Sequence, residues 1–409
     1  MAVTVRDPIH RSILVEPWAV PLLDAPVVQR LRRILQLGNA HLVYPGARHS
    51  RFEHSLGAHH MAGRLAAALG LDEHEARTVR AAALLHDVGH GPFSHAFEEL
   101  VKEEGRRHEE ASVDLIAWGP LGDLLRQSGL DPTAVADAVA GRGPLAPLVS
   151  GSLDADRTDY LLRDAHYTGV PTSVDPDRLL EVVERDAKHG VVLRSSGLTA
   201  AEALLTTRYL MYPSVYLHRT VRSCESMLLA AIRDLIQQGG ATLRELERET
   251  DDVVLARLRA AKGPASELAT RLDERRLHKH ALEIRPSGNA EWTRLSRDPA
   301  ARRKLGAQLA DAARLPHHMV LLDVPQPPKF RELALQVRQP DGSLIPLPQA
   351  SRLVAVLQEA RDDHWRAWVF APRAERERVA AVARRELGDL AAGAVAPASG
   401  SASAAAPFA

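Results

Sequence analysis

Residues 84–95 read LLHDVGHGPFSH, and the apolar residues that precede them from position 75 predict a buried helix that ends here. The glycines and the proline of this stretch would stop the helix abruptly. His86 and Asp87 therefore stand side by side at the end of a buried helix, where a carboxylate must be paired or coordinated. One metal ion would satisfy both side chains, and His90 would share their face if the helix continued one more turn.

Two further segments supply enough ligands for a complete metal site. His54 begins an apolar helical pattern upstream, and Asp156 lies at the start of another one downstream. With His86 and Asp87 they make two imidazoles and two carboxylates, a set that suits Mn, Fe, Mg, Zn or Ni without choosing between them. For the His-Asp pair alone, the alternative is a helix-end histidine beside a capped or salt-bridged aspartate.

Histidine is concentrated in the first third of the chain. Eleven of the 19 histidines lie at or before residue 108, and histidine is the commonest metal ligand among the side chains. This excess indicates a site in that region. Several of the eleven are nevertheless expected to be ordinary surface residues, namely His10, His49, His59, His60 and His74.

The composition excludes several classes of protein. The chain has 409 residues, and its 52 basic residues balance 52 acidic ones, so it is not a globally basic nucleic-acid binder. The single cysteine, Cys224, excludes a disulfide framework and a cysteine-rich metal site. No apolar run approaches the roughly 18 residues of a membrane helix, and the first residues lack the apolar core of a signal peptide. We expect a soluble, cytoplasmic protein of two or three domains without a membrane contact.

Apolar spacing predicts a mainly α fold. Residues 1–240 have helical patterns, and the longest of these, 199–238, should break at Pro213. Residues 241–390 should form a smaller lobe that is charged and helical at first and α/β afterwards. Its expected strands are 319–322, 333–337 and 365–370, and its later helices span about 349–361 and 374–387. Residues 391–409 are rich in Ala, Ser, Gly and Pro and should form a disordered tail.

The order His, His-Asp, Asp across three helices resembles that of the HD-domain metal-dependent phosphohydrolases. Within them the chain looks like the deoxynucleoside triphosphate triphosphohydrolases. The matching segments are 7–10, 29–32, 36–38, 44–47, 51–57, 86–95 and 156–164. They cover about residues 5–225 in the family's order, and the likeness fades in the C-terminal third. The resemblance implies an HD-domain helical core over residues 1–240.

The resemblance also implies hydrolysis of a deoxynucleoside triphosphate (dNTP). A divalent metal held by His54, His86, Asp87 and Asp156 would lower the pKa of a water molecule and polarise a phosphoryl oxygen. The water would attack the α-phosphorus and release a deoxynucleoside and inorganic tripolyphosphate.

A triphosphate carries about four negative charges, so the site needs cations besides the metal. By resemblance these are Arg51, Arg157 and Arg208, each of which could instead form a surface salt bridge. A member of the family has lysine at the position of Arg157. Arginine keeps the charge but forks differently, so the phosphate geometry could shift.

Three histidines resemble those that line the family's site beside the metal, namely His90, His95 and His108. One of them would protonate the leaving 5′ oxygen or hold the attacking water. We favour His95, which Glu98 could orient from the next helical turn, and take His108 as second choice. The alternative is that these histidines bind a second metal ion.

Asp156, Tyr160 and Asp164 recur every four residues and so share one helix face. By resemblance Tyr160 and Asp164 read the deoxyribose, while Gln36 and Leu37 close on its 3′-hydroxyl. Tyr160 would crowd a 2′-hydroxyl, which implies a preference for deoxyribonucleotides.

Tyr212 and Tyr216 follow Arg208 at the same four-residue step and could pack on the sugar or the base. The alternative is a pair of core aromatics flanking Pro213. The family has histidine where Tyr212 stands, so the likeness is weaker at this position.

Some relatives are tetramers that a nucleotide bound between subunits activates. Asp24, Gln29 and Arg32 match guanine-reading positions of such a site, although Arg32 could equally be structural. A lysine of the family's N-terminal strand is replaced here by Val3. The contact of that lysine with the activator's triphosphate has no counterpart at Val3. From the other matching positions, the resemblance implies a homo-oligomer, either a dimer or a tetramer, with GTP or a dNTP as a candidate activator.

Two other functions stay open at this point. The same metal set would serve another HD phosphohydrolase, namely a nucleotidase, a pyrophosphohydrolase or a phosphodiesterase. A non-catalytic nucleotide or nucleic-acid sensor is the second alternative, with single-strand binding at a subunit interface. The net charge of +0 disfavours general nucleic-acid affinity. The C-terminal region carries no motif for chemistry and is expected to be an accessory lobe.

Overall fold

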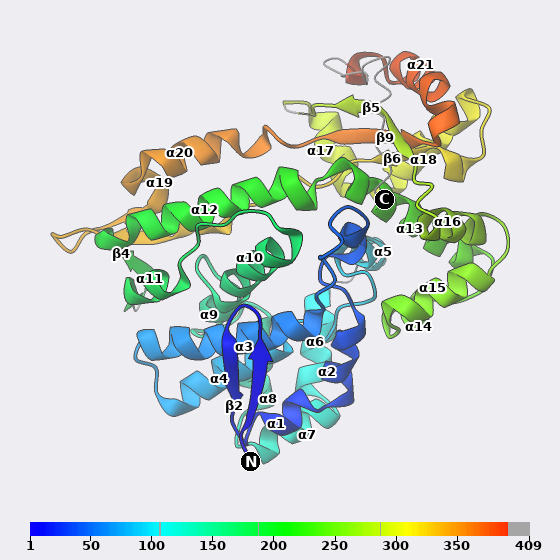
Figure 1. Ribbon diagram of the computed structural model, residues 1–409. Coiled ribbons are helices and arrows are strands. Elements are labelled where there is room, and N and C mark those ends of the chain that lie inside the picture. Colours follow the sequence, from blue (N-terminus) through cyan, green and yellow to red (C-terminus); the bar gives the residue numbers. More distant parts are fainter. Residues whose placement is uncertain (106–107, 187, 287, 392–409) are drawn as a thin grey trace, which may run out of the picture.

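The computed structural model describes residues 1–105, 108–186, 188–286 and 288–391, and it is mainly helical with a smaller strand-containing C-terminal part, as expected (Figure 1). The helices of the first half are α1 (Val20–Leu23), α2 (Pro26–Arg30), α3 (Arg51–Ala68), α4 (Glu73–Leu85), α5 (His95–Glu103), α6 (His108–Ala117), α7 (Pro120–Gln127), α8 (Pro132–Val139), α9 (Ala146–Ser150), α10 (Ala155–Thr168) and α11 (Pro176–Glu181). Those of the second half are α12 (Leu198–Met211), α13 (Arg219–Gln237), α14 (Leu243–Glu247), α15 (Asp251–Ala260), α16 (Pro264–Asp273), α17 (Ala290–Arg297), α18 (Pro299–Ala312), α19 (Leu347–Ala350), α20 (Arg352–Glu359) and α21 (Arg376–Leu387).

Two of the small sheets in the described part of the chain join segments that are far apart in sequence. The strands are β1 (Val3–Asp7), β2 (Arg11–Val15), β3 (Val183–Asp186), β4 (Gly190–Arg194), β5 (Lys279–Ile284), β6 (Leu321–Asp323), β7 (Gln336–Arg338), β8 (Leu344–Pro346) and β9 (Ala367–Ala371). Within the described residues, β1 pairs with β2, the order β3-β4-β7-β8 forms a second sheet, and β5-β9-β6 forms a third. The contact between β4 and β7 is parallel and carries the C-terminal region back to the helical core.

The helices α3, α4 and α10 form the packed centre of the helical core: α3 contacts both of the others and lies beside α4 in the lower half of Figure 1. Each begins at a side-chain cap, because Ser50, Asp72 and Asp154 accept hydrogen bonds from backbone N–H groups of the first helical turn. The predicted buried helix is α4, whose last residues, 81–85, are all buried. The caps thus fix where the helices that carry the expected ligands begin.

A glycine allows α3 and α10 to approach closely. A Cβ at Gly57 would lie 2.5 Å from Asp159 Cγ and would also overlap the Arg163 guanidinium. Ordinary contacts between carbon atoms are about 3.5–4.0 Å, so any larger residue here would force the two helices apart.

The predicted break at Pro213 is confirmed. Residues Tyr212–Tyr216 form a π-helical turn between α12 and α13, since proline cannot continue the regular hydrogen-bond pattern. The break lets α12 follow the helical core while α13 enters the C-terminal part of the molecule (Figure 1).

The strands depart from the sequence prediction in two ways. The first part of the C-terminal lobe was expected to be helical, but β5 lies within it, and β3 and β4 were not predicted at all. The strands expected to build one α/β unit divide between two sheets, since β6 and β9 pair together whereas β7 pairs with β4.

The hydrophobic core crosses the expected domain boundary at residue 240. Val337 and Val354 pack in the same buried cluster as α3 and α4, and Phe97 of α5 packs with residues of α13 and α16. The domain limits therefore stay a prediction.

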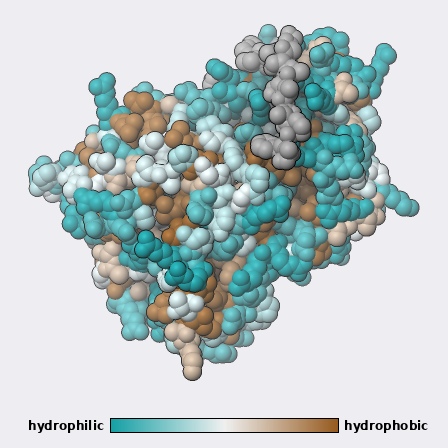
Figure 2. Space-filling view, in the orientation of Figure 1, coloured by the Kyte–Doolittle hydropathy of each residue, from teal (hydrophilic) through white to brown (hydrophobic). Residues whose placement is uncertain are grey.

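Polar and charged side chains cover most of the face in Figure 2, and hydrophobic residues gather there only in small groups. Every helix in the described part of the chain is too short or too polar to cross a bilayer.

Candidate metal centre and substrate cavity

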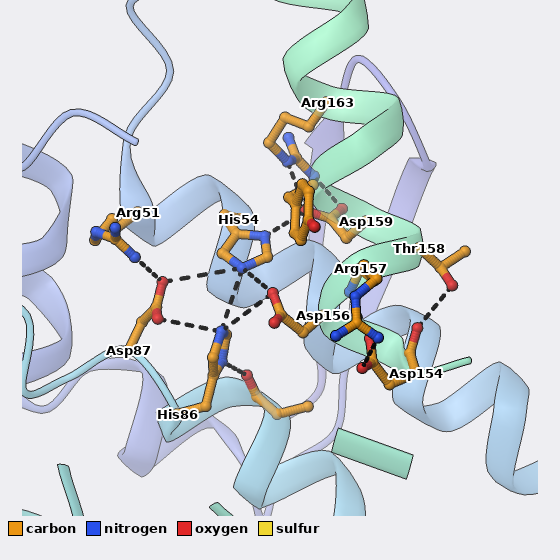
Figure 3. Close-up of polar contacts among 12 residues, drawn as sticks. Arg51, His54, His86, Asp87, Asp154, Asp156, Arg157, Thr158, Asp159 and Arg163 are labelled. Atoms are coloured by element: carbon orange, nitrogen blue, oxygen red, sulfur yellow. Dashed lines mark hydrogen bonds and ion pairs between the residues drawn. The ribbon is translucent and has the colours of Figure 1, made fainter. Parts of the chain in front are cut away.

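Four side chains from three helical segments converge at the centre of the helical core (Figure 3). His54 lies in the first turn of α3, His86 and Asp87 directly follow α4, and Asp156 lies in the first turn of α10. His54, His86 and Asp87 form a group whose ligand atoms all lie within 4.8 Å of one another. Asp156 Oδ1 joins them at 3.0 Å from His54 Nε2 and 3.6 Å from His86 Nε2. The structure thus brings together all four predicted ligands.

The hydrogen bonds of the two histidines show which nitrogen faces the cluster. His54 Nδ1 lies 2.8 Å from Asp159 Oδ2, and His86 Nδ1 lies 2.7 Å from the Ala83 carbonyl. When both Nδ1 atoms donate, the two Nε2 lone pairs face each other across 3.3 Å. Ligands bound at about 2.1 Å to one ion lie about 3 Å apart, so the residues present fit a divalent metal.

Electrostatics make the cluster strongly charged. Burial opposes protonation of His54, but hydrogen bonds with Asp156 and Asp159 prevail and raise its pKa to about 10. Burial likewise opposes ionisation of Asp87, yet Arg51 and the neighbouring histidines hold its pKa well below its usual range. The carboxylates of the site therefore stay ionised, and a cation that binds between them is stabilised.

A buried carboxylate behind the cluster orients His54. Asp159 accepts hydrogen bonds from Arg163 at 2.9 and 3.0 Å and lies 2.7 Å from His10 Nε2, while Arg163 also donates to Asp7 at 2.8 Å. Such carboxylate–histidine pairs fix the tautomer and the ring orientation of metal ligands. His10, which we expected at the surface, instead belongs to this network.

Arg51 links the metal cluster to the cavity beside it. Its Nη1 donates to Asp87 at 2.5 Å and its Nε donates to Ser94 Oγ at 2.7 Å. The side chain is buried, and Nη2 has no hydrogen-bond partner among the described residues. A buried guanidinium nitrogen without a partner is costly, which marks this atom as a contact for a bound anion.

A cavity of about 630 Å³ opens over the cluster. The predicted substrate-binding residues that line it are Gln36, Leu37, Arg51, Arg157, Tyr160, Asp164, Arg208, Tyr212 and Tyr216, and His90 and Glu98 line it as well. His90 Nε2 lies 3.3 Å from Asp87 Oδ1, beside the metal cluster. His95 and His108 begin α5 and α6, but their side chains lie outside the described part of the chain.

The expected sugar-reading residues meet at His49. Asp164 lies between His49 Nε2 at 2.8 Å and the Tyr216 hydroxyl at 2.8 Å, one on each carboxylate oxygen. The carbonyl of His49 accepts the backbone N–H of Gln36 at 3.0 Å. Gln36 Oε1 is buried with no partner within the described residues, so it can accept a hydrogen bond from a ligand.

The other two arginines are already engaged. Arg208 donates from Nη1 to the Tyr160 hydroxyl at 3.0 Å and from Nη2 to the Lys329 carbonyl at 2.9 Å. Arg157 donates to Asp154 at 2.8 Å and also to the Gly151 carbonyl, and Figure 3 shows it turned toward Asp154. Arg157 thus lines the cavity while its guanidinium is held within its own helix end.

The prediction that His49 and His59 are surface residues is wrong. Both are buried, whereas His74 is exposed and His60 is half-buried. For His59 a signal existed, because Phe52, Leu56 and His59 recur at helical spacing on the inner face of α3. His49 has no such signal, since its partner Asp164 lies 115 residues away.

The expected regulatory residues lie outside this cavity. Asp24 is exposed where α1 ends, Gln29 donates to the Leu23 carbonyl at 2.9 Å, and Arg32 donates to Gln29 at 2.8 Å. Arg32 also lies 3.6 Å above the ring of Phe52. A single chain does not test activation by a nucleotide, which stays a prediction.

Sequence analysis missed the contribution of the C-terminal lobe. Arg297, Arg302 and residues 324–329 of this lobe line the same cavity as the metal cluster. The proline-rich run 325–328 was a detectable signal for a rigid segment, although nothing in it indicates where it packs.

Two family models match the chain. The model described as the HD domain covers residues 51–127, and the one described as the HD associated region covers residues 174–392. An uncharacterised protein of Methanocaldococcus jannaschii is 35% identical over 282 residues, which are 68% of this chain and 59% of that protein. The human deoxynucleoside triphosphate triphosphohydrolase SAMHD1 is 30% identical over 353 residues, covering 71% of this chain and 56% of its own. The chain thus spans little more than half the length of these two curated relatives.

Solved structures resemble this chain over more than nine tenths of its length. A phosphohydrolase from Bacteroides thetaiotaomicron is 26% identical with a TM-score of 0.73, covering 91% of this chain and 100% of its own. A hypothetical protein from Aquifex aeolicus is 28% identical with a TM-score of 0.76, covering 93% and 100%.

Proposed function

The chain belongs to the HD-domain phosphohydrolases that carry the HD-associated region, and on this premise we propose that it hydrolyses dNTPs to a deoxynucleoside and inorganic tripolyphosphate. The observation that carries the proposal is the shared cavity. It joins the metal cluster to Arg51, whose Nη2 has no partner among the described residues, and to the sugar-reading pair Gln36 and Asp164. The names of relatives such as human SAMHD1 support the same substrate class.

The chemistry requires one divalent metal, held by His54, His86, Asp87 and Asp156. When bound it lowers the pKa of a water molecule and polarises a phosphoryl oxygen. We propose Mn²⁺ or Mg²⁺, with Fe, Zn and Ni as the other candidates, because a mixed imidazole and carboxylate set accepts all of them.

Residues of the chain stabilise the charge on the triphosphate and transfer the proton. Arg51 and Arg208 neutralise the triphosphate as charge gathers on it in the transition state. The attacking water loses a proton, the bond between the α-phosphorus and the 5′ oxygen breaks, and that oxygen takes up a proton. His90 is a proposed proton donor because its side chain lies beside the cluster. His95 and His108 remain proposed for the same role.

Gln36 and Asp164 set the position of the sugar. Asp164 retains an acceptor lone pair on each oxygen after its bonds to His49 and Tyr216. It can therefore accept a hydrogen bond from the 3′-hydroxyl group, while Gln36 contacts the same hydroxyl from the other side. Tyr160, one turn after the ligand Asp156, leaves little space for a 2′-hydroxyl.

Product analysis tests the proposal. Each dNTP is incubated with the protein and Mn²⁺ or Mg²⁺, and the phosphate products are separated. We expect tripolyphosphate and deoxynucleoside from wild type and none from the double variant His86→Ala/Asp87→Ala. His74→Ala, which removes an exposed histidine of the preceding helix α4, should keep full activity. Release of monophosphate or pyrophosphate would instead assign another HD phosphohydrolase activity. Failure of all nucleotides, alone and mixed, would favour a nucleotide or nucleic-acid sensor.

Regulation is a separate proposal. We expect a homo-oligomer in which GTP or a dNTP binds near Asp24, Gln29 and Arg32 and activates hydrolysis. A lag or a sigmoidal rate with one dNTP that mixed nucleotides remove would support it. Hyperbolic kinetics with every nucleotide alone would contradict it.

A further inference from the structure

One wall of the cavity comes from the C-terminal lobe and has no part in the chemistry described above. Residues 324–329 read VPQPPK, directly follow β6 and line the cavity together with Tyr212. This segment, here called the proline wall, belongs to the HD-associated region. The residues that bind metal and sugar all come from the helical core, so the wall is the part of the cavity that a core alone would lack.

The proline wall is held rigidly. The carbonyl of Val324 accepts from Arg302 at 3.2 Å, and that of Pro325 accepts from the Trp365 indole at 2.7 Å. The carbonyl of Lys329 accepts from Arg208 at 2.9 Å. Both ends are therefore fixed by buried or half-buried side chains, and the prolines restrict the backbone between them. A preorganised wall loses little conformational entropy when a ligand packs on it.

A chain of contacts places the wall at one end of the substrate. Tyr216 donates to the proposed sugar-reading residue Asp164 at 2.8 Å. The ring of Tyr212 lies 5.5 Å from that of Tyr216 and 5.6 Å from that of Phe330, the residue directly after the wall. This order leads from the sugar-reading side of the cavity, away from the metal cluster, to the wall. The part of a nucleotide beyond its sugar is the base, so the base is the group that meets the wall.

The chemistry of the wall suits a flat heteroaromatic ring. Prolines have no backbone N–H and present apolar ring faces. Tyr212 lies on the same side of the cavity, 5.6 Å from the ring of Phe330. Gln326 is exposed to the cavity and carries both an acceptor and two donors. Apolar faces with one amide can pack on a nucleobase and hydrogen-bond its edge.

We propose that the proline wall is the nucleobase subsite and that Gln326 determines specificity among the dNTPs. This inference rests on the proposed function, because it takes a nucleotide as the ligand. It assigns to the HD-associated region a direct contact with substrate, where the sequence indicated only an accessory lobe.

The test compares Gln326→Ala with wild type on all four dNTPs, both as kcat/KM and as Kd from calorimetry. Loss of one hydrogen bond to a base should change the preference between the best and the worst nucleotide about three- to tenfold. Gln349→Ala, which removes an exposed glutamine of the same lobe outside the cavity, should leave the preference unchanged. A loss in structural stability would lower activity on all four nucleotides by the same factor and would not move their ratio.

The outcomes separate the two proposals. If wild type releases no tripolyphosphate, the proposed function fails, and the four Kd values still decide the role of Gln326. If Gln326→Ala keeps the nucleotide preference of wild type, or weakens all four dNTPs equally, the inference is overturned while the proposed function stands.

Discussion

Replacing Gly57 by alanine should disrupt the metal centre from a position that touches no ligand. A Cβ there would lie 2.5 Å from Asp159 Cγ, about 1 Å inside ordinary contact. A separation of α3 and α10 by 1 Å would lengthen the bond between His54 and Asp159 from 2.8 Å to beyond hydrogen-bond range. Bonds to charged groups contribute about 1.5–3 kcal/mol each. Loss of two such hydrogen bonds between α3 and α10 would cost about 3–6 kcal/mol. Alanine has a higher helix propensity than glycine by about 1 kcal/mol, so the free energy of unfolding should fall by about 2–5 kcal/mol.

Gly63 offers a matched control on the same helix. A Cβ there would meet the side chain of Arg80 at 3.0 Å, and that side chain can shift, so Gly63→Ala should be neutral or slightly stabilising. Denaturant unfolding measures both variants at 25 °C, and calorimetry measures their affinity for Mn²⁺. We expect Gly57→Ala alone to lose stability and to bind Mn²⁺ about 10–100-fold more weakly. Equal unfolding midpoints and equal affinities for the two variants would refute the reasoning.

Three further predictions concern the same core. Asp159→Asn should weaken Mn²⁺ binding about 10–100-fold by calorimetry because His54 loses its anionic partner, and an affinity within twofold of wild type would contradict this. Burial and the nearby Arg80 lower the pKa of His59 to about 4. Between pH 6.5 and pH 4, His59 is therefore protonated in the unfolded chain but neutral in the folded protein. Wild type should therefore lose about 2 kcal/mol more unfolding free energy between pH 7 and pH 5 than His59→Gln does, and parallel profiles would rule out this role. Mn²⁺ at 100 times its Kd should raise the unfolding free energy of wild type by about 2.7 kcal/mol and leave His86→Ala/Asp87→Ala unchanged, as chelator titration can check.

The ligand cluster could be anticipated because its signals are local. His86 and Asp87 are adjacent in sequence at the end of an apolar helix, and this placement alone raises the question of a metal. The local signal at Asp156 is weaker, since an aspartate at a helix start is common for capping alone, and the order His, His-Asp, Asp across three helices strengthens it. The helices themselves follow from apolar periodicity and from the break at Pro213.

Contacts between distant segments could not be anticipated. The ring of His49 reaches Asp164 across 115 residues, and Asp159 reaches His10 across 149, while neither pair leaves a periodic pattern. The strands β4 and β7 are short and pair in parallel only because the C-terminal region folds back on the core. Their burial depends on that partner, which local propensity does not contain.

The pairing of β7 with β4 and the position of the proline wall have a consequence for biosynthesis. The last of the proposed metal ligands, Asp156, is made 173 residues before Lys329 completes the cavity. At about 5–20 residues per second, the ribosome adds that interval in roughly 9–35 s. During this time the nascent chain already contains all four proposed metal ligands but lacks part of the cavity wall that we propose to hold the nucleotide. The order of synthesis therefore delays assembly of the complete cavity until the C-terminal lobe has been made.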